Sequence, residues 1–271
     1  SEYVFRMCVS YRKINAFTKP FQFYVARCDD AVEWIGESLF FITLDLDAGY
    51  WQVKLHALSK EKTAFFIPDG KRHWNVMPMG ILNAHAFFVC MTMQMKDEWD
   101  KKFTEDPAAA IARLKQVAKR RRSFLKEMEH GEMIEQLLEE HSAEALKTSN
   151  SGSAVIVDDL MLHDRNAVSL LAYFLCVLEV LVHYRVTINL RKGRFLPSRA
   201  EFVGVDVLPE GNSPAQSKYG PIKKLCAPER VTELRAFIRL WGCSLPCLHP
   251  FEAAMTLWPC VMPLTVDRAV Q

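Results

Sequence analysis

Three aspartates stand beside short apolar segments that are far apart in the chain. Asp45 lies in TLDLDAGY at residues 43–50, and Asp158 and Asp159 follow the apolar run AVIV at residues 154–157. Both segments have the composition of buried strands, in which an unpaired carboxylate is costly. Carboxylates brought together repel one another, and divalent cations relieve that repulsion. Because Mg²⁺ is held by one or two carboxylates together with substrate phosphates, the two segments would form a magnesium site for phosphate chemistry if they meet.

Spacing alone also allows a second interpretation, in which these aspartates are unrelated residues at strand ends. Seven motifs favour the first interpretation: FRMCVSYRKIN at 5–15, TLDLDAGYWQ at 43–52, EKTAF at 61–65, NVMPMGILNA at 75–84, VDDL at 157–160, FVGVDV at 202–207 and VTELRAFI at 231–238. In types and order they resemble the reverse transcriptase domain of Ty3/gypsy-type LTR retrotransposons. The resemblance covers most of the chain and implies an RNA-directed DNA polymerase, a nucleotidyltransferase, within a retroelement polyprotein.

The implied reaction is template-directed DNA synthesis from dNTPs by a two-metal mechanism. A primer 3′-hydroxyl attacks the α-phosphate of the incoming nucleotide, and two metal ions stabilise the attacking and leaving oxygens. By the resemblance, Asp45 would bind both ions, Asp158 would be the second direct ligand, and Asp159 a supporting one. The main-chain carbonyl of Leu46 would complete the nucleotide-side ion. The cofactor is therefore expected to be two Mg²⁺ ions, with Mn²⁺ as a possible replacement.

The resemblance assigns four residues to nucleotide binding. Arg6 would reach the triphosphate, because a guanidinium suits phosphate geometry. Tyr50 would close against the sugar and exclude a 2′-hydroxyl. Met79 and Gly80 would form the floor of the pocket, with Gly80 allowing close approach of the backbone. The alternatives that stay open are a surface role for Arg6 and a core role for Tyr50.

Further residues would contact the nucleic acid. The segment Phe202, Val203 and Gly204 resembles the strand turn that grips the primer end. Lys192 resembles a palm lysine near the site, and Arg12 belongs to the first motif; both are weaker assignments. The expected partners are an RNA or DNA template with its primer and dNTPs, with RNase H and integrase domains in the parent polyprotein.

The fold implied by the resemblance is α+β, the right-hand polymerase with an antiparallel palm sheet backed by helices. The expected parts are fingers at 1–19 and 53–83, palm at 20–52, 84–97 and 151–208, and the start of a thumb or connection at 213–271. The sequence PDG at 68–70 predicts a turn between two strands. The sequence EGNSP at 210–214 predicts a break after the palm.

Residues 98–150 depart from the family pattern and are predicted to form a charged helical insertion. Ile111, Leu114 and Ala118 follow helical spacing; charge is almost all positive from 113 to 126 and almost all negative from 127 to 144. We expect two helices with a bend near Gly131, projecting from the palm rather than completing its core. A basic arm that touches nucleic-acid phosphates, through Arg120 and its neighbours, is the open alternative.

Composition sets wide limits on location and partners. The 271 residues carry a net charge of +2, which neither supports nor excludes nucleic-acid binding. The eight cysteines include no CxxC pair, which favours a reduced intracellular setting. The resemblance implies a cytoplasmic particle or the nucleus of a eukaryotic host. The apolar stretch at 167–184 approaches membrane-spanning length, but its place after the Asp-Asp strand predicts a buried palm helix and no membrane.

Several positions differ from the family pattern without touching the aspartates. His85 stands where proline is expected, Val89 where glutamine is expected, and Ile156 and Val157 precede the aspartates in place of the usual tyrosine followed by a variable residue. These changes leave open a catalytically inactive relic that keeps the fold and nucleic-acid binding. A non-enzymatic interaction module built around the charged segment is the remaining alternative.

Overall fold

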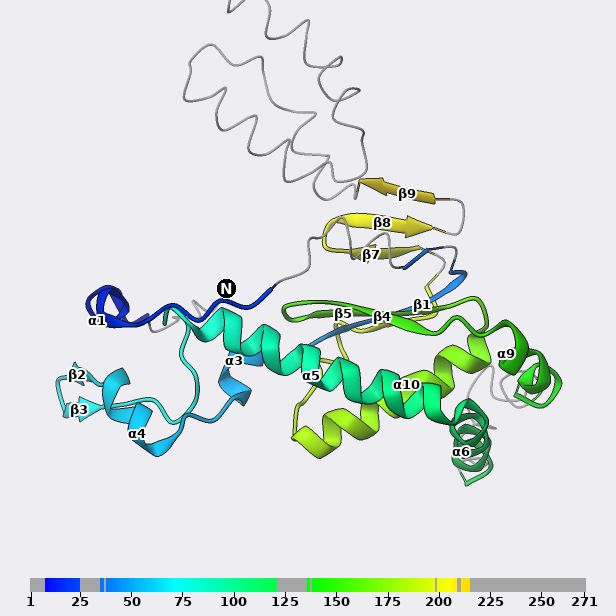
Figure 1. The fold of residues 1–271 in the computed structure, drawn as a ribbon, viewed down its shortest axis with the longest axis horizontal. Helices are drawn as coiled ribbons and strands as arrows, with labels where there is room; N and C mark the ends of the chain where they lie inside the picture. The colour runs from blue at the N-terminus through cyan, green and yellow to red at the C-terminus, as the bar shows by residue number, and fades with distance from the viewer. Residues whose placement is uncertain are drawn as a thin grey trace, which may run out of the picture.

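The structure, a computed structural model, describes residues 8–24, 35–36, 38–120, 136, 138–197, 199–208 and 211–214. Its centre is a four-stranded antiparallel sheet in the order β4-β5-β1-β6 (Figure 1). The strands are β1 (Phe40–Asp45), β4 (Gly152–Ile156), β5 (Asp159–Asp164) and β6 (Arg194–Phe195). The two aspartate-bearing segments are thus β1 and the β4–β5 hairpin, and they are neighbours in one sheet.

Both faces of this sheet are covered, and side chains alternate between them along β1. Ile42 and Leu44 belong to the main core, which includes the helices α5 (Ala84–Glu105) and α10 (Ala167–Tyr184). Phe41 belongs to a second cluster, with Met161 and Phe202. By the same alternation Asp45 shares the face of Phe41 rather than that of the helical core.

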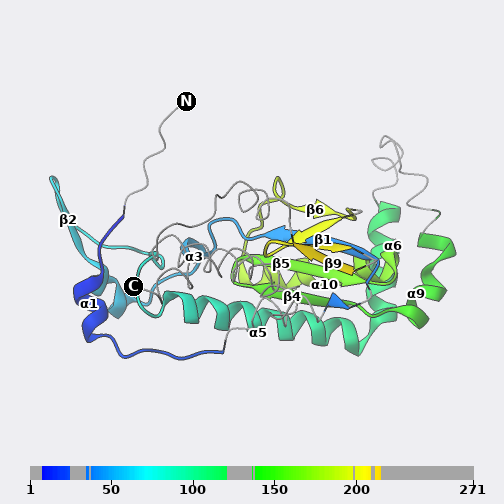
Figure 2. The ribbon, with the colours of Figure 1, turned by 90° about the horizontal axis from the view of Figure 1, so that it is seen from above.

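Helix α5 runs along the length of the molecule beside the sheet (Figures 1 and 2). At one end lie α1 (Arg12–Phe17), α4 (Ala57–Lys60), the 3-10 turn Glu61–Thr63, β2 (Phe65–Ile67) and β3 (Gly70–Arg72). At the other end lie α6 (Pro107–Arg120) and α9 (Ser142–Thr148). The short helix α3 (Gly49–Gln52) follows β1 directly. Residues 68 and 69 join β2 to β3, so the predicted turn is confirmed.

Helix α10 is the apolar stretch found in the sequence. Its N-terminus is capped by Asn166, whose side-chain oxygen accepts from the Val168 N–H at 2.8 Å, and it ends at Arg185 in the left-handed conformation. Among the described residues, α10 is the one helix long and apolar enough to cross a membrane. Half of it is buried, against α5, α6 and the sheet, which is the environment of a core helix.

A second, three-stranded sheet covers the Phe41 face. It consists of β7 (Ala200–Phe202), β8 (Val205–Leu208) and β9 (Gly211–Pro214), all antiparallel. The predicted break at 210–214 is therefore wrong for Gly211–Pro214, which form an edge strand paired with β8. The edge position is the physical reason, because an edge strand tolerates glycine and proline that a central strand does not.

The described part of the 98–150 segment does not project from the molecule, and that prediction is wrong. Helix α5 continues past residue 97 to Glu105, and the bend that the structure describes is at Asp106, between α5 and α6. Trp99, Phe103 and Ile111 are all buried in the main core. The predicted bend at Gly131 lies outside the described residues.

Polar contacts also join this segment to the palm elements. The Trp99 indole N–H donates to Ser153 Oγ of β4 at 3.1 Å, and the hydroxyl oxygen of Tyr173 in α10 lies 2.9 Å from the same Ser153 oxygen. Tyr173 also donates to Asp100. The proportion of charged residues in the segment is high, but each helix buries one apolar stripe, and the stripe decides where the helix packs.

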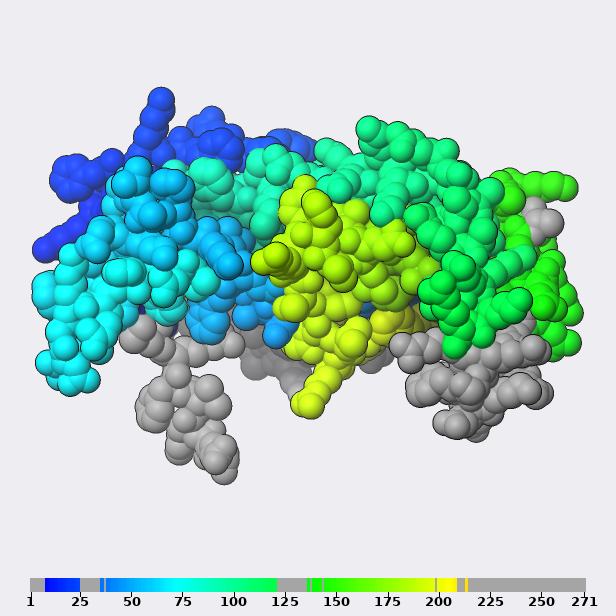
Figure 3. Space-filling view, turned by 90° about the horizontal axis from the view of Figure 1, so that it is seen from below, coloured from blue at the N-terminus to red at the C-terminus, as the bar shows by residue number. Residues whose placement is uncertain are grey.

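The space-filling view shows how these elements meet on one side of the molecule (Figure 3). The cyan β2–β3 end and the green α6–α9 end are separated by yellow-green atoms from the end of α10 and the loop after it. The division into fingers, palm and thumb stays a prediction, and residues 215–271 of the predicted thumb lie outside the described residues.

Candidate active site

The register of the central sheet brings Asp45 and Asp159 together. In the β1–β5 pair, Asp45 is the direct partner of Asp159, at the last position of one strand and the first of the other. Directly opposed side chains lie on the same face of a sheet. The pairing extends one residue further through the Leu46 N–H, which donates to the Asp158 carbonyl at 3.2 Å. All three predicted aspartates therefore meet at one end of the sheet.

Asp158 occupies the two-residue turn that joins β4 to β5. Ile156 pairs with Asp159, so Val157 and Asp158 form the turn, and Val157 has φ of +58°. Left-handed backbone is costly for a β-branched residue and is found where the surroundings over-determine the conformation. The turn directs Asp158 toward α3: a Cβ added at Gly49 would lie 3.2 Å from Asp158 Oδ1.

The electrostatics of the site are those of crowded carboxylates. Burial raises the pKa of Asp158, and the charges of Asp159 and Asp45 raise it further, against smaller lowering effects of His85 and Lys192. For Asp159, loss of surrounding water raises the pKa first and the charge of Asp45 second, with Lys192 opposing. For both residues, burial raises the pKa more than the neighbouring like charges do.

Lys192 forms an ion pair with this cluster. Its Nζ lies 2.9 Å from Asp45 Oδ2, and this pairing raises the pKa of the lysine. The loop that carries it is tied to β1, because the Asn189 N–H donates to the Asp45 carbonyl at 2.8 Å and Leu46 bridges to Ile188. The Lys192 ammonium thus offsets part of the negative charge of the three aspartates.

Two cavities meet at Asp45. The first, of about 570 Å³, is lined by residues of three regions: Cys8, Val9 and Tyr11; Asp45, Leu46, Asp47, Ala48, Gly49 and Trp51; and Trp74, Pro78, Met79, Gly80, Asp158 and Lys192. Met79 and Gly80, predicted as the floor of a nucleotide pocket, are thus beside the aspartates. Gly80 has φ of +92° and its Cα faces the Tyr11 ring, so the backbone here favours glycine.

The second cavity, of about 460 Å³, lies on the side of the β7–β8 turn. Asp45, Asp159 and Lys192 line it together with Phe202, Val203 and Gly204, the predicted primer grip. Val203 and Gly204 have φ of +52° and +81°, which is the backbone of a tight two-residue hairpin turn. Phe202 is also buried in the second cluster, so it joins the cavity wall to that cluster.

The residues present fit a hard divalent cation, although they do not form a finished cage. Asp158 Oδ1 is buried and has no hydrogen-bond partner, so a strong acceptor is left unsatisfied at this position. Among the described residues, no group of three or more His, Cys, Asp or Glu side chains is placed to hold a metal ion. Oxygen donors completed by substrate phosphates are the usual arrangement for Mg²⁺.

The remaining predicted residues fall in different places. Tyr50 is half-buried, stacks on Phe88 of α5 with ring centroids 4.9 Å apart, and has its hydroxyl 3.2 Å from His85 Nδ1. Arg12 is exposed at the start of α1 and is not among the residues that line either cavity. Arg6 lies outside the described residues.

Sequence reasoning did not single out several residues that shape the site. Trp51 and Trp74 line the first cavity and stack at 6.2 Å, and Gln52 bonds the main chain of Thr187 in both directions, at 2.7 and 2.9 Å. Trp51 and Gln52 belong to the second motif, and this membership was the feature of the sequence that could have pointed to them. The contact between Gln52 and Thr187 joins residues 135 positions apart, and no local pattern reports it.

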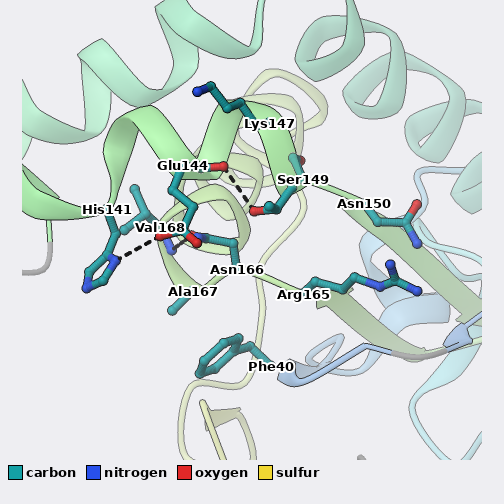
Figure 4. Close-up of a pocket in the computed structure, with 11 residues that line it drawn as sticks. Phe40, His141, Glu144, Lys147, Ser149, Asn150, Arg165, Asn166, Ala167 and Val168 are labelled. Atoms are coloured by element: carbon teal, nitrogen blue, oxygen red, sulfur yellow. Dashed lines mark hydrogen bonds and ion pairs between the residues drawn. The ribbon is translucent and has the colours of Figure 1, made fainter.

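A larger cavity, of about 740 Å³, lies at the opposite end of the sheet (Figure 4). Phe40, Lys147, Arg165 and Asn166 are among its lining residues. Phe40 is at the far end of β1 from Asp45, and the Asn166 side chain already caps α10. This cavity therefore takes no part in the aspartate site.

The fold and the aspartate-bearing hairpin together define a polymerase-type α+β protein, and a solved structure agrees. The foamy viral protease–reverse transcriptase dRH in complex with double-stranded DNA matches with a TM-score of 0.64 at 16% identity, covering 96% of this chain and 37% of that chain. At this identity the likeness shows the fold alone, and it confirms the predicted fold class.

The chain belongs to the reverse transcriptase (RNA-dependent DNA polymerase) family, which matches residues 3–207. It is 25% identical over 239 residues to the retrovirus-related Pol polyprotein from transposon 297 of Drosophila melanogaster, covering 88% of this chain and 18% of that protein. The Pol polyprotein from transposon gypsy of the same organism is 22% identical over 235 residues, with 87% and 18% covered. The predicted kinship with Ty3/gypsy-type elements is confirmed, and the chain spans about a fifth of these relatives.

Proposed function

We propose that the chain performs template-directed DNA synthesis from dNTPs as the reverse transcriptase part of a retroelement polyprotein. The observation that carries the proposal is that Asp45 lines both cavities, with Asp158 on the first and Asp159 on the second. An in-line transfer needs a nucleotide on one side of shared carboxylates and a primer end on the other. The two cavities supply those two sides.

Asp45, Asp158 and the main-chain carbonyl of Leu46 would hold two Mg²⁺ ions, or Mn²⁺ in their place, with Asp159 supporting them. When bound, the ions would activate the primer hydroxyl and neutralise charge on the departing phosphates. Lys192 would leave Asp45 as the ions bind, and would then be available to a nucleic-acid phosphate. Gly80 would let the incoming nucleotide approach the backbone, and the Val203–Gly204 turn would hold the primer end.

The partners proposed are an RNA or DNA template with its primer, and RNase H and integrase domains elsewhere in the parent protein. The structural relative is described as bound to double-stranded DNA, and the sequence relatives as Pol polyproteins. Both descriptions suit a polymerase domain of a larger protein. We also propose an intracellular location, in a cytoplasmic particle or the nucleus, because of the proposed role in a retroelement polyprotein and because of the cysteine pattern.

The test is primer extension with Mg²⁺ on matched RNA and DNA templates. The chain should extend the primer in the order that the template dictates, and Asp45→Asn should lower the rate about a thousandfold or more, since the amide keeps the shape and loses the charge. Asp97→Asn, on the exposed side of α5, is the matched control and should extend like the parent. Primer–template binding without extension by the parent would contradict the proposal and favour the inactive relic.

A further inference from the structure

Tyr50 is held by two residues on successive turns of α5. Its ring stacks on Phe88, with centroids 4.9 Å apart and planes 17° from parallel, and its hydroxyl lies 3.2 Å from Nδ1 of His85. Positions 85 and 88 are three residues apart, so both side chains project from the same side of the helix. Phe88 is fully buried, whereas His85 is exposed. The core thus fixes the ring face, and an exposed imidazole fixes the hydroxyl.

The main chain of Tyr50 is fixed independently of these contacts. Helix α3 begins after the left-handed Ala48, and the Trp51 N–H donates to the Ala48 carbonyl at 2.8 Å. Gln52 accepts from the Thr187 N–H at 2.7 Å and donates to the Thr187 carbonyl. With the backbone anchored, the freedom left to Tyr50 is in its side-chain torsions, and the bond to His85 restricts those.

Tyr50 and His85 both lie beside the aspartates. Gly49 and Trp51, on either side of Tyr50, line the first cavity. After burial, the charge of Asp158 is what raises the pKa of the Tyr50 hydroxyl, and His85 in turn acts on Asp158. Tyr50 and His85 are not themselves among the residues that line the cavity, but Gly49, next to Tyr50, packs between Phe88 and Asp158: a Cβ there would lie 2.5 Å from Phe88 Cζ and 3.2 Å from Asp158 Oδ1.

We propose that His85 is a positioning residue that holds Tyr50 in the orientation which selects deoxyribose over ribose. The inference rests on the proposed function, because it concerns the sugar of the nucleotide bound there. A phenol ring fixed at both its face and its hydroxyl presents a rigid edge, and a rigid edge rejects an additional 2′-hydroxyl better than a ring that can turn aside. Proline, the residue expected at this position from the family resemblance, has no side-chain group that could make this bond.

The experiment measures the ratio of kcat/KM for a dNTP to that for the matching rNTP in primer extension. His85→Leu removes the hydrogen bond and should lower the ratio about threefold to tenfold, the effect of one hydrogen bond. His85→Gln, whose amide can bond the hydroxyl, should keep it. His183→Leu, the same change at an exposed histidine near the far end of α10, is the matched control and should leave the ratio unchanged.

A double-mutant cycle separates positioning from general damage. Tyr50→Phe removes only the hydroxyl and should lower the ratio as His85→Leu does, and the double variant should fall no further, since both changes break one contact. An unchanged ratio in His85→Leu, or additive losses in the double variant, would overturn the inference while leaving the proposed function intact.

Nucleotide binding without turnover covers the case in which the parent does not extend a primer. With Ca²⁺ in place of Mg²⁺, the affinities of a dNTP and an rNTP for the primer–template complex give a second selectivity ratio, and His85→Leu should lower it by the same factor. If the parent does not extend the primer but His85→Leu still lowers the binding ratio, the proposed function is contradicted and the inference about His85 stands. An unchanged binding ratio, or no nucleotide binding by the parent, overturns the inference.

Discussion

At the scale of single residues, the site places negatively charged carboxylates close together and partly out of water, which is electrostatically unfavourable. Asp158 keeps a buried oxygen without a partner, and the pKa values of Asp158 and Asp159 are both raised by burial and by neighbouring carboxylates. A raised carboxylate pKa means that the ionised form costs stability at neutral pH, and that the cost is relieved on protonation as pH falls. Function rather than folding explains such an arrangement.

Asp158→Asn should therefore stabilise the fold while it abolishes synthesis. The amide removes the repelling charge, and we expect the melting temperature to rise by roughly 2–4 °C, about 1 kcal/mol for a chain of this size. Thermal unfolding at pH 7 without divalent cations measures it, with Asp97→Asn as the exposed control. A lower melting temperature for Asp158→Asn than for the control would argue against stored repulsion.

Gly49 is required by close packing rather than by its backbone angles. A Cβ at this position would lie 2.5 Å from Phe88 Cζ and 3.2 Å from Asp158 Oδ1. Gly49→Ala should cost roughly 1–3 kcal/mol of unfolding free energy, as overpacking of a filled site does, and should slow primer extension as well. Urea unfolding measures the first effect.

Gly193→Ala is the matched control, because its added Cβ would come no closer than 3.4 Å to any neighbour. It should be neutral within about 0.5 kcal/mol. Equal losses for the two variants would mean that the packing around Gly49 is looser than described.

At the scale of elements, α5 and α6 show that a charged segment can complete a core. Phe103, near the end of α5, is buried and meets the Tyr173 ring of α10 edge to face at 5.2 Å. Phe103→Ala should lower the free energy of unfolding by about 3–5 kcal/mol. Val117→Ala, on the exposed side of α6, should change it by less than about 0.5 kcal/mol. A change in unfolding free energy for Phe103→Ala as small as that for Val117→Ala would instead support the projecting insertion that the sequence predicts.

The strands that carry chemistry were predictable from the sequence because their motifs are local. The runs around Asp45 and Asp158 are apolar, short and bounded by turn residues, and pairing them was implied by the family resemblance. The turn between β2 and β3 followed from PDG alone. The position of residues 98–120 was not predictable from the proportion of charged residues, because the buried stripe of Trp99, Phe103 and Ile111 is a minority of the residues.

Long-range contacts account for the rest of what the sequence did not show. The edge strand β9 was predicted to be a break, since glycine and proline are typical of turns and proline is tolerated in a sheet mainly at its edge. The His85–Tyr50 bond joins two residues that are 35 positions apart, and only the fold brings them together. The site residues themselves were proposed from motif spelling, and their roles stay predictions.

At the scale of the whole molecule, one buried histidine links stability to pH. His163 of β5 lies with Nδ1 2.9 Å from Ser38 Oγ, and burial lowers its pKa to about 4; Lys96 lowers it as well, while Asp164 and Asp100 raise it. The unfolded chain, with the ordinary pKa of about 6.5, binds the proton first. Stability is therefore complete above pH 6.5 and is lost as pH falls from about 6.5 toward 4.

The parent should lose about 2 kcal/mol from this residue between pH 7 and pH 5. His163→Gln keeps a hydrogen-bonding side chain but does not titrate, so its stability should fall less over this interval. Urea unfolding at both pH values gives the loss of unfolding free energy for each protein. The difference between the two losses isolates His163, because the other titrating groups contribute equally to both. If the unfolding free energies of the parent and His163→Gln fall equally between pH 7 and pH 5, His163 is not held neutral in the folded protein.

The central claim is that Asp45, Asp158 and Asp159 hold the cations of DNA synthesis between the two cavities. Counting bound Mn²⁺ by electron paramagnetic resonance tests it most directly, on the chain with primer–template ending in a dideoxynucleotide and the next dNTP. The account predicts two Mn²⁺ ions per complex for the parent, and loss of both at the same concentration for Asp45→Asn, since Asp45 would ligate both. Equal Mn²⁺ binding by Asp45→Asn and the parent would contradict it.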